Sequence, residues 1–198
     1  MSSPEPAPEE TEEPRPWPLQ GQRPGADYRI FRSRFDALTN PRTGETMERV
    51  VLEAPDWVNV TALTPEGEVV IVKQYRFGTA STTIEIPGGM VDPGEDPLEA
   101  ARRELLEETG FASERWSLMG SVAPNPAFLN NRCYHYLAED AHQVAPPALD
   151  GGEDIVVTTL SQEQIAAGVA SGEIDHALVL TAMLRLLDLR PRSHGRQP

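Results

Sequence analysis

The sequence has 198 residues, a length that suits one domain with a full core plus tails. Its formal net charge is −14, which argues against a protein that grips nucleic acid or an anionic membrane by charge, so we expect neither as a partner. Cys133 is the single cysteine, which excludes an intrachain disulfide and a metal site made of thiolates.

Both ends of the chain are predicted to be tails. Residues 1–25 are rich in Pro and Glu and hold few large apolar side chains, so burial cannot offset the entropy of ordering them. We therefore expect a disordered acidic tail at 1–25, a folded domain at 26–190 and a second disordered tail at 191–198. No basic segment followed by an apolar one opens the sequence, and no apolar run reaches the length of a membrane span, so we expect a cytoplasmic protein.

Strand patterns dominate the first half of the predicted domain. Residues 28–38 and 47–52 favour two strands, joined by a turn at 40–44. Residues 57–63 alternate, with Val58, Val60 and Ala62 on one face. Residues 69–72 are continuously apolar, as expected of a central strand that is covered on both faces.

A helix is predicted between Asp96 and Gly110. Asp96 is a suitable N-cap, Pro97 suits the first helical position, and Gly110 suits a left-handed C-cap. One buried stripe is expected to contain Leu98, Ala101 and Leu105, because these residues fall at helical spacing.

The end of this helix is unusually acidic. Glu104 and Glu108 are i, i+4 neighbours, and Glu107 adjoins both. Like charges at this spacing cost roughly 0.2–0.5 kcal/mol, and carboxylates in a last turn also oppose the helix dipole. A solvated acidic face is one explanation. A bound Mg²⁺ is the other, because that ion takes carboxylate oxygens and keeps waters for substrate phosphates.

The second half is predicted to contain strands at 116–122, 132–137 and 154–160, with Cys133 buried in the second of these. Helices are expected at 161–172, where Ser161-Gln162-Glu163-Gln164 forms a capping box, and at 175–189. Strands and helices do not alternate as βαβ units, which favours an α+β fold with a mixed sheet. The apolar side of the last helix is predicted to include Ala177, Leu180, Leu184 and Leu187.

One segment carries a specific motif, G-x5-E-x7-R-E-U-x-E-E-x-G-U, where U is bulky and apolar. Its fixed positions are Gly89, Glu95, Arg103, Glu104, Leu105, Glu107, Glu108, Gly110 and Phe111. The motif resembles the Nudix box at every fixed position. The resemblance implies the Nudix fold, an α/β/α sandwich, and hydrolysis of a nucleoside diphosphate linked to another group with the help of a divalent metal.

The same resemblance implies roles for individual residues. Mg²⁺, or Mn²⁺, would be held by Glu104, Glu108, Glu153 and the carbonyl of Gly88. Glu95 and Arg103 would support the carboxylates structurally. The catalytic base that takes a proton from water would be Glu153 or Glu107, and these two alternatives stay open.

Beyond the box, the chain resembles the branch of ADP-ribose pyrophosphatases and nucleoside diphosphate sugar hydrolases. The resemblance rests on Gln74-Tyr75-Arg76, on Glu85-Ile86-Pro87-Gly88-Gly89, on a proline sixteen positions after Gly110, and on Gly152-Glu153-Asp154-Ile155. The strand pair before Trp57 matches the N-terminal extension through which these enzymes form homodimers. The substrate-binding residues so implied are Trp57, Arg76, Glu85, Pro126 and Arg132.

Departures from that branch favour a broader or different nucleotide-sugar preference. The proline stands in Pro124-Asn125-Pro126-Ala127-Phe128, without the usual Ser before it and Gly after it. Gly151 occupies a position where some relatives have a glutamate that acts as the catalytic base. The four histidines, His135, His142, His176 and His194, show no ligand spacing, and we expect none of them to take part in the chemistry.

Three alternatives to nucleotide-sugar hydrolysis remain open. The substrate could be a dinucleoside polyphosphate, coenzyme A or a nucleoside triphosphate, although no basic cluster suits a longer polyphosphate. A non-catalytic nucleotide-sugar sensor is the second alternative, although such proteins commonly lose acidic box residues and all are present here. A scaffold that recruits partners through its acidic tail is the third.

Overall fold

The computed structural model of the protein describes residues 13–149 and 151–186, so the predicted second tail lies outside the described residues. The fold separates into two compact units, one ending at Leu52 and the other beginning at Glu53. We predicted a single domain over 26–190 with the first strands as an extension. The structure instead gives these strands a unit of their own, because they hydrogen-bond to one another in a separate sheet.

The N-terminal unit contains three strands, β1 (Leu19–Asp27), β2 (Arg32–Thr39) and β3 (Thr46–Glu53), arranged in that order. The sequence predicts two strands and a disordered tail up to residue 25; from Leu19 onward the tail prediction is wrong. The nine residues of β1 include Gly and Pro and are all exposed, so no hydrophobic pattern reveals the strand. Antiparallel backbone pairing with β2 defines it instead.

The second unit contains the remaining described strands. They are β4 (Trp57–Ala62), β5 (Val69–Arg76), β6 (Ser81–Glu85), β7 (Gly88–Met90), β8 (Phe111–Ala112), β9 (Arg115–Val122), β10 (Cys133–Glu139), β11 (His142–Gln143) and β12 (Ile155–Leu160). They form sheets in the orders β7-β4-β10-β9, β12-β5-β6 and β11-β8. The β4–β10 pair is parallel and the other pairs are antiparallel, which confirms the predicted mixed sheet.

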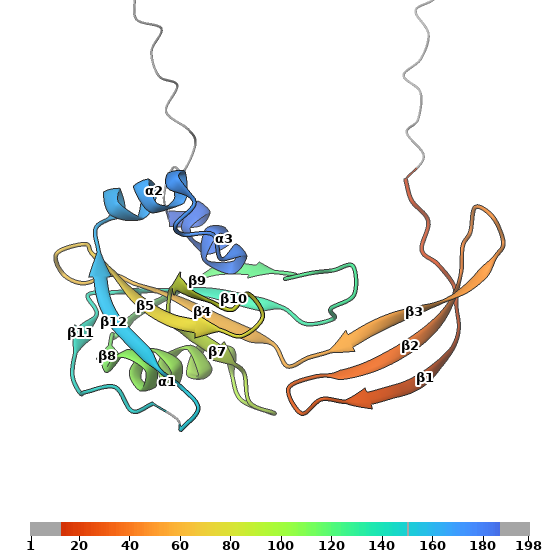
Figure 1. Ribbon diagram of the computed structural model, residues 1–198, viewed down its shortest axis with the longest axis horizontal. Coiled ribbons are helices and arrows are strands. Elements are labelled where there is room, and N and C mark those ends of the chain that lie inside the picture. Colours follow the sequence, from red (N-terminus) through yellow and green to blue (C-terminus); the bar gives the residue numbers. More distant parts are fainter. Residues whose placement is uncertain (1–12, 150, 187–198) are drawn as a thin grey trace, which may run out of the picture. The chain divides into compact units, whose positions relative to one another are not determined.

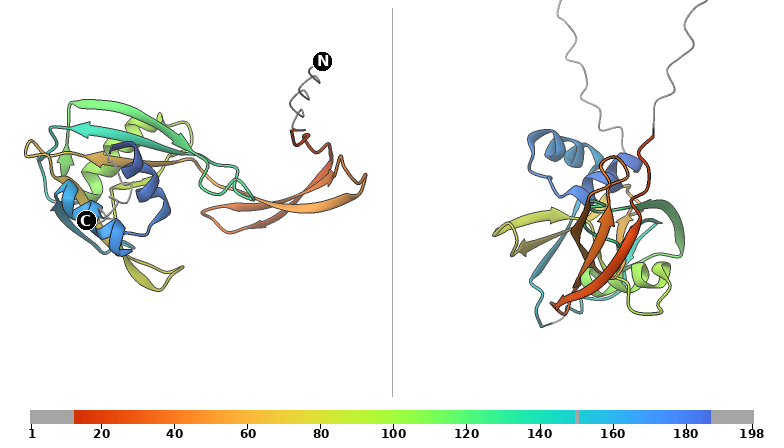
Figure 2. Two further views of the ribbon diagram at one scale, coloured as in Figure 1. Left: turned by 90° about the horizontal axis from the view of Figure 1, so that it is seen from above. Right: turned by 90° about the vertical axis from the view of Figure 1, so that its right-hand side faces the viewer.

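Three described helices complete this unit: α1 (Pro97–Thr109), α2 (Gln162–Ser171) and α3 (Ala177–Leu186). Helix α1 covers one face of the strands, and α2 and α3 lie on the opposite face (Figures 1 and 2). The predicted α+β class and α/β/α layering are confirmed. None of the described helices is long and apolar enough to cross a membrane, and the predicted cytoplasmic location stays a prediction.

Two hydrophobic clusters fill the spaces between these layers. Strand β5 contributes Val70 to the cluster under α1 and Ile71 to the cluster under α2 and α3, so it is covered on both faces as predicted. The cluster under α1 contains Val58, Val60, Ala62, Val70, Ala100, Ala101, Leu105, Tyr136, Ala138 and Ala141. The other contains Val69, Ile71, Ile86, Ile165, Ile174, Val179, Ala182 and Met183.

The face that α3 buries differs in part from the prediction, although the predicted Leu180 packs against the cluster under α2 and α3. Its buried residues are Val179, Ala182 and Met183, whereas Leu184 is exposed. The sequence of α3 is apolar on nearly every side, so helical periodicity does not decide which stripe faces the sheet. Leu187, part of the predicted stripe, lies outside the described residues.

Strand β4 contributes residues both to the hydrophobic core and to the region around Gly88. Val58, Val60 and Ala62 join the cluster under α1, as their alternation predicts. Asn59 points the other way, and its Oδ1 accepts a 3.1 Å hydrogen bond from the thiol of Cys133, which is buried as predicted. Asn59 also pairs with Gly88 of β7, which places Asn59 beside the residue that immediately precedes the motif glycine, Gly89.

A buried histidine links β10 to α3. His135 is 0% exposed, and its Nε2 lies 3.3 Å from Thr181 Oγ1. That hydroxyl donates to the carbonyl of Leu178 at 2.9 Å, so it accepts from the Nε2–H of a neutral ring. The other ring nitrogen, Nδ1, is buried and finds no hydrogen-bond partner among the described residues. Burial, with the positive charge of Arg185, lowers the pKa of His135 to about 4.

This histidine makes stability sensitive to acid. The unfolded chain takes up the proton near pH 6.5 and the folded one near pH 4. The contribution of neutral His135 to the free energy of unfolding is therefore complete above pH 6.5 and is lost as the pH falls towards 4. We expect the free energy of unfolding to drop by up to about 3 kcal/mol over that window. In His135→Leu, urea titrations at pH 4.5 to 7.5 should show a shallower drop. His142→Leu, at an exposed histidine, is the control, and equal slopes in all three proteins would contradict the assignment.

Candidate active site

Helix α1 begins and ends where its sequence predicts. Asp96 Oδ1 accepts a 2.8 Å hydrogen bond from the backbone N–H of Leu98, and Gly110 adopts a left-handed conformation with φ of 72°. A Cβ at Gly110 would overlap the Ala145 carbonyl, so glycine is needed for the close approach as well. The backbone N–H of Ala148 donates to the Glu107 carbonyl, and the helix end is thereby tied to the loop that leads to Glu153.

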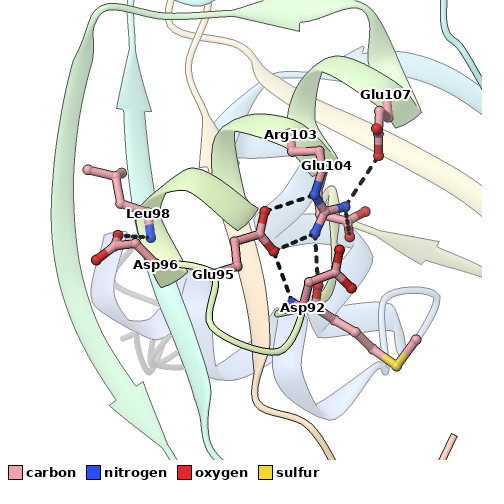
Figure 3. Close-up of polar contacts among 8 residues, drawn as sticks. Asp92, Glu95, Asp96, Leu98, Arg103, Glu104 and Glu107 are labelled. Carbon is pink, nitrogen blue, oxygen red and sulfur yellow. Dashed lines mark hydrogen bonds and ion pairs between the residues drawn. The ribbon is translucent and has the colours of Figure 1, made fainter.

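Arg103 connects this helix to the segment that precedes it (Figure 3). Its Nε and Nη2 donate to the two carboxylate oxygens of Glu95 at 3.0 and 2.9 Å, and Nη2 also donates to the Met90 carbonyl at 3.0 Å. Its Nη1 donates to Glu104 at 2.8 Å and to Glu107 at 3.3 Å. One guanidinium therefore holds three carboxylates and the carbonyl at the end of β7 in fixed relation.

Glu95 itself is held from two sides. Besides the bonds from Arg103, its Oε2 accepts a 2.9 Å hydrogen bond from the backbone N–H of Asp92. These hydrogen bonds, first those from Arg103, keep the pKa of Glu95 below its usual range. The contacts are those of a supporting residue. The supporting roles of Glu95 and Arg103 stay predictions.

Gly89 lets the loop approach the helix closely. A Cβ at this position would overlap the carboxylate of Glu104. The next residue back, Gly88, donates its backbone N–H to Glu108 Oε2 at 2.8 Å. The two glycines thus bring backbone against both carboxylates of the i, i+4 pair.

Two carboxyl groups of α1 are electrostatically strained. Glu108 is 4% exposed, and burial, reinforced by the charges of Glu104 and Glu153, raises its pKa to about 8. Burial also raises the pKa of Glu104, and the charges of Glu107 and Glu153 act in the same direction. The ion pair with Arg103 opposes this rise without cancelling it.

These groups line one cavity of about 500 Å³, here called the acidic cavity. Its walls are Gln74, Arg76, Gly88, Gly89, Met90, Asp92, Arg103, Glu104, Glu107, Glu108, Ala148 and Glu153. Carboxylate and carbonyl oxygens are the ligands that Mg²⁺ and Mn²⁺ prefer, and a cation would offset the burial and the repulsion that raise both pKa values. Within residues 13–149 and 151–186, no three His, Cys, Asp or Glu side chains are already gathered closely enough to hold an ion. The donor set fits a hard cation, and binding would draw these carboxylates together.

A second cavity of about 270 Å³ adjoins the first and is here called the Trp57 cavity. Arg76, Gly88, Gly89 and Met90 belong to the walls of both cavities. The complete lining of the Trp57 cavity is Trp57, Val58, Asn59, Arg76, Glu85, Gly88, Gly89, Met90, His176 and Leu178.

Arg76 is fixed at the boundary by Glu85. Its Nε and Nη2 donate to the two oxygens of Glu85 at 2.6 and 2.7 Å, and Thr83 Oγ1 donates to the same carboxylate at 2.6 Å. Glu85 is 2% exposed. Burial alone would raise the pKa of Glu85, but the hydrogen bonds from Arg76 and Thr83 outweigh it and hold the pKa below its usual range. Glu85 therefore acts on Arg76, and its oxygens are already engaged by protein donors.

The structure brings most, but not all, of the predicted site residues together. Gly88, Arg103, Glu104, Glu107, Glu108 and Glu153 meet in the acidic cavity, and Trp57 and Glu85 meet in its neighbour. Pro126 and Arg132 line neither cavity. The guanidinium of Arg132 instead donates to Ser121 Oγ at 3.0 and 2.8 Å, a partner on the adjacent strand.

The prediction missed Asn59 and His176. Both line the Trp57 cavity, yet they lie on different elements and no sequence spacing relates them. The alternation of β4 marks Asn59 only as a polar residue between buried apolar ones. His176 has no local signal, because its relation to Glu85 arises from the packing of α3 against the sheet.

Comparisons with known proteins identify the family. The NUDIX domain model matches residues 29–179, so the chain belongs to the Nudix family. It is 34% identical over 137 residues to the methanol dehydrogenase activator of Bacillus methanolicus, covering 68% of this chain and 74% of that one. It is 32% identical over 132 residues to the ADP-ribose pyrophosphatase of Bacillus subtilis (strain 168), covering 66% of this chain and 71% of that one.

A solved structure supports the fold. The crystal structure of an ADP compounds hydrolase superposes with a TM-score of 0.75 at 19% identity, and the match covers 89% of this chain and 95% of that one. At this level of identity the likeness bears on the fold alone.

The strained carboxyl group generates a prediction about stability without metal. The unfolded chain releases the Glu108 proton near pH 4.5 and the folded one near pH 8, so the free energy of unfolding falls as the pH rises through that window. In EDTA, Glu108→Gln should therefore be more stable than the wild type at pH 8.5, by on the order of a few kcal/mol, and no more stable at pH 4.5. Urea unfolding measures both differences.

The matched control is Glu107→Gln, because the Glu107 side chain is 48% exposed and should tolerate its charge in water. Adding Mg²⁺ should stabilise the wild type and leave Glu108→Gln unchanged. If Glu108→Gln gains no stability at pH 8.5, the carboxyl group is not strained as described.

Proposed function

We propose that this Nudix protein is a metal-dependent pyrophosphohydrolase that cleaves nucleoside diphosphate sugars to a nucleoside monophosphate and a sugar phosphate. The observation that carries the proposal is the acidic cavity, where crowded carboxylates and Arg76 line a space large enough for a diphosphate. A relative that is 32% identical is an ADP-ribose pyrophosphatase, which agrees with this substrate class.

The metal ligands are proposed to be Glu104, Glu108, Glu153 and the Gly88 carbonyl. Mg²⁺ is the expected ion, and Mn²⁺ suits the same oxygen donors. An ion held there would neutralise the diphosphate and make a water molecule more acidic. The chain's own contribution is to hold these oxygens in place: Arg103 fixes Glu104, and the Gly88 N–H fixes Glu108.

Arg76 is proposed to bind the diphosphate. Two of its donor nitrogens are engaged by Glu85, which orients the guanidinium and leaves Nη1 for a phosphate oxygen. Because Glu85 is buried and bonded from several sides, Arg76 does not need to be ordered when substrate arrives. Glu85 is thus a positioning residue in this proposal.

The base that accepts the proton of the attacking water is proposed to be Glu153, with Glu107 as the alternative. Both carboxylates line the acidic cavity. Glu107 accepts a hydrogen bond from Arg103 at 3.3 Å, and Glu153 reaches the cavity from the loop before β12. A carboxylate in this position would take the proton as the water oxygen bonds to one phosphorus of the diphosphate. The bond from that phosphorus to the bridging oxygen breaks, and the bridging oxygen leaves with the other phosphate.

One set of assays tests the reaction and the base together. Purified protein is given nucleoside diphosphate sugars with Mg²⁺ or with EDTA, and phosphate released from the products by added phosphatase is measured. We expect turnover only with metal, and a loss of about 100-fold or more in Glu108→Gln. Glu153→Gln should lose about 100- to 10,000-fold in kcat and Glu107→Gln less than about tenfold.

Three outcomes would contradict the proposal. The reverse order of the two losses would make Glu107 the base. Near-wild-type turnover in Glu108→Gln would remove the metal site. Absence of turnover with every nucleotide sugar, while dinucleoside polyphosphates, coenzyme A or nucleoside triphosphates are cleaved, would replace the substrate class.

We also propose that the N-terminal sheet mediates a homodimer. An isolated sheet of three strands needs a covered face to be stable, yet in β1, β2 and β3 only Asp36 is buried. The unit also exposes large apolar side chains: Trp17, Leu19, Tyr28, Ile30 and Val50. A second copy of the chain would cover such a surface, as expected for this branch of the family.

Charged substitutions on this sheet test the dimer. In the double variant Ile30→Glu, Val50→Glu, two carboxylates would be buried in the interface, so we expect light scattering after size exclusion to report monomers instead of dimers. Val156→Glu, which changes an exposed apolar residue of β12, should leave the wild-type mass unchanged. A monomeric wild-type protein across the tested concentrations would contradict the proposal.

A further inference from the structure

The Trp57 cavity is chemically unlike the acidic cavity beside it. The two share a wall formed by Arg76, Gly88, Gly89 and Met90, so a ligand whose diphosphate lies at Arg76 has one end in each. We propose that the Trp57 cavity binds the nucleobase and that His176 is a specificity-determining residue that selects among bases. The inference rests on the proposed function and adds which half of the substrate lies on this side.

The composition of the walls favours a base over a sugar. Trp57, Met90 and Leu178 offer apolar surface that suits the two flat faces of a heteroaromatic ring. A sugar carries hydroxyl groups around its whole rim, and against such walls several would lose their hydrogen bonds to water without replacement. A base concentrates its polar groups on its edge, where a few protein groups suffice.

Few polar side chains are available for that edge. Glu85 is not one of them, because Arg76 and Thr83 already occupy its oxygens. The oxygen of Asn59 likewise accepts the Cys133 thiol, which leaves its amide group as a donor. Asn59 can therefore only donate to a base edge, and His176 is the polar side chain of the lining that can also accept.

His176 is well placed and has unused hydrogen-bonding capacity. It immediately precedes α3, and its carbonyl accepts the Leu180 N–H at 3.0 Å, which fixes its backbone. Its side chain is 29% exposed in the cavity wall, and Nε2 lies 3.7 Å from Glu85, beyond hydrogen-bonding distance. Nδ1 is buried and finds no hydrogen-bond partner among the described residues. A neutral imidazole donates from one nitrogen and accepts at the other, so it distinguishes bases whose edges differ.

The order of groups along the substrate agrees with this placement. A nucleoside diphosphate sugar runs from base to ribose to diphosphate to sugar. With the base against Trp57, the diphosphate reaches the free Nη1 of Arg76 and the carboxylates beyond it, and the sugar extends past them. The chemistry then takes place away from the residue that chooses the base.

Two substrate series test the inference with His176→Leu. The first varies the base at constant sugar (ADP-, GDP-, UDP- and CDP-glucose), and the second varies the sugar at constant base (ADP-ribose, ADP-glucose and ADP-mannose). Loss of one hydrogen bond to the base edge should reduce the ratio of kcat/KM between the best and worst base by about tenfold, mainly through KM. Ratios in the sugar series should stay within about twofold.

Matched variants separate recognition from folding. His176→Gln keeps a donor and an acceptor and should restore part of the base preference. Leu178→Phe narrows the cavity without touching the histidine and should raise KM for every nucleotide. His142→Leu makes the same substitution at an exposed histidine outside both cavities and should change nothing.

A binding measurement in EDTA stands apart from turnover. Calorimetry should show that His176→Leu weakens AMP binding about tenfold and leaves ribose 5-phosphate unaffected. This result supports the inference even if the wild type hydrolyses no nucleotide sugar, in which case only the proposed function fails. Altered sugar ratios with unaltered base ratios, or equal AMP binding in both proteins, would overturn it.

Discussion

The site depends on one constraint, which is that several carboxylates must be kept close together at the end of a helix. Helix α1 ends with Glu104, Glu107 and Glu108, where the helix dipole already disfavours negative charge, and no basic residue lies in its last turn. Arg103 makes the arrangement possible, because its guanidinium spans Glu95, Glu104 and Glu107 at once. The three carboxylates still repel one another, and all three line the acidic cavity, where a cation would reduce that repulsion.

Much of the surrounding fold follows from holding backbone against these groups. Gly89 leaves room for the Glu104 carboxylate, and Gly110 lets the loop before Glu153 lie against the helix end. A sequence selected for stability alone would separate the charges. Here burial, together with the charges of Glu104 and Glu153, raises the pKa of Glu108, a compromise that is common at binding sites.

Local signals predicted the structure where it is locally determined. Asp96, Pro97 and Gly110 bound α1 through capping chemistry within the helix itself, and the residue order around them identified the family. Signals failed where distant segments decide. Strand β1 depends on backbone pairing, the buried face of α3 on a sheet far away in sequence, and the partners of Arg76 and His176 on packing between elements. Pro126 and Arg132 were assigned by resemblance alone, and the structure places neither in the two cavities.

The two adjoining cavities separate chemistry from selection. The acidic cavity includes Gly89, Arg103, Glu104, Glu107 and Glu108, which are fixed positions of the family motif. The Trp57 cavity draws on β4 and on the start of α3, which the motif does not include. The two cavities share only Arg76, Gly88, Gly89 and Met90. Side chains at Asn59, His176 and Leu178 can therefore change without a change in the lining carboxylates of α1. Substrate preference can therefore diverge within this fold while the machinery for cleaving a diphosphate stays the same.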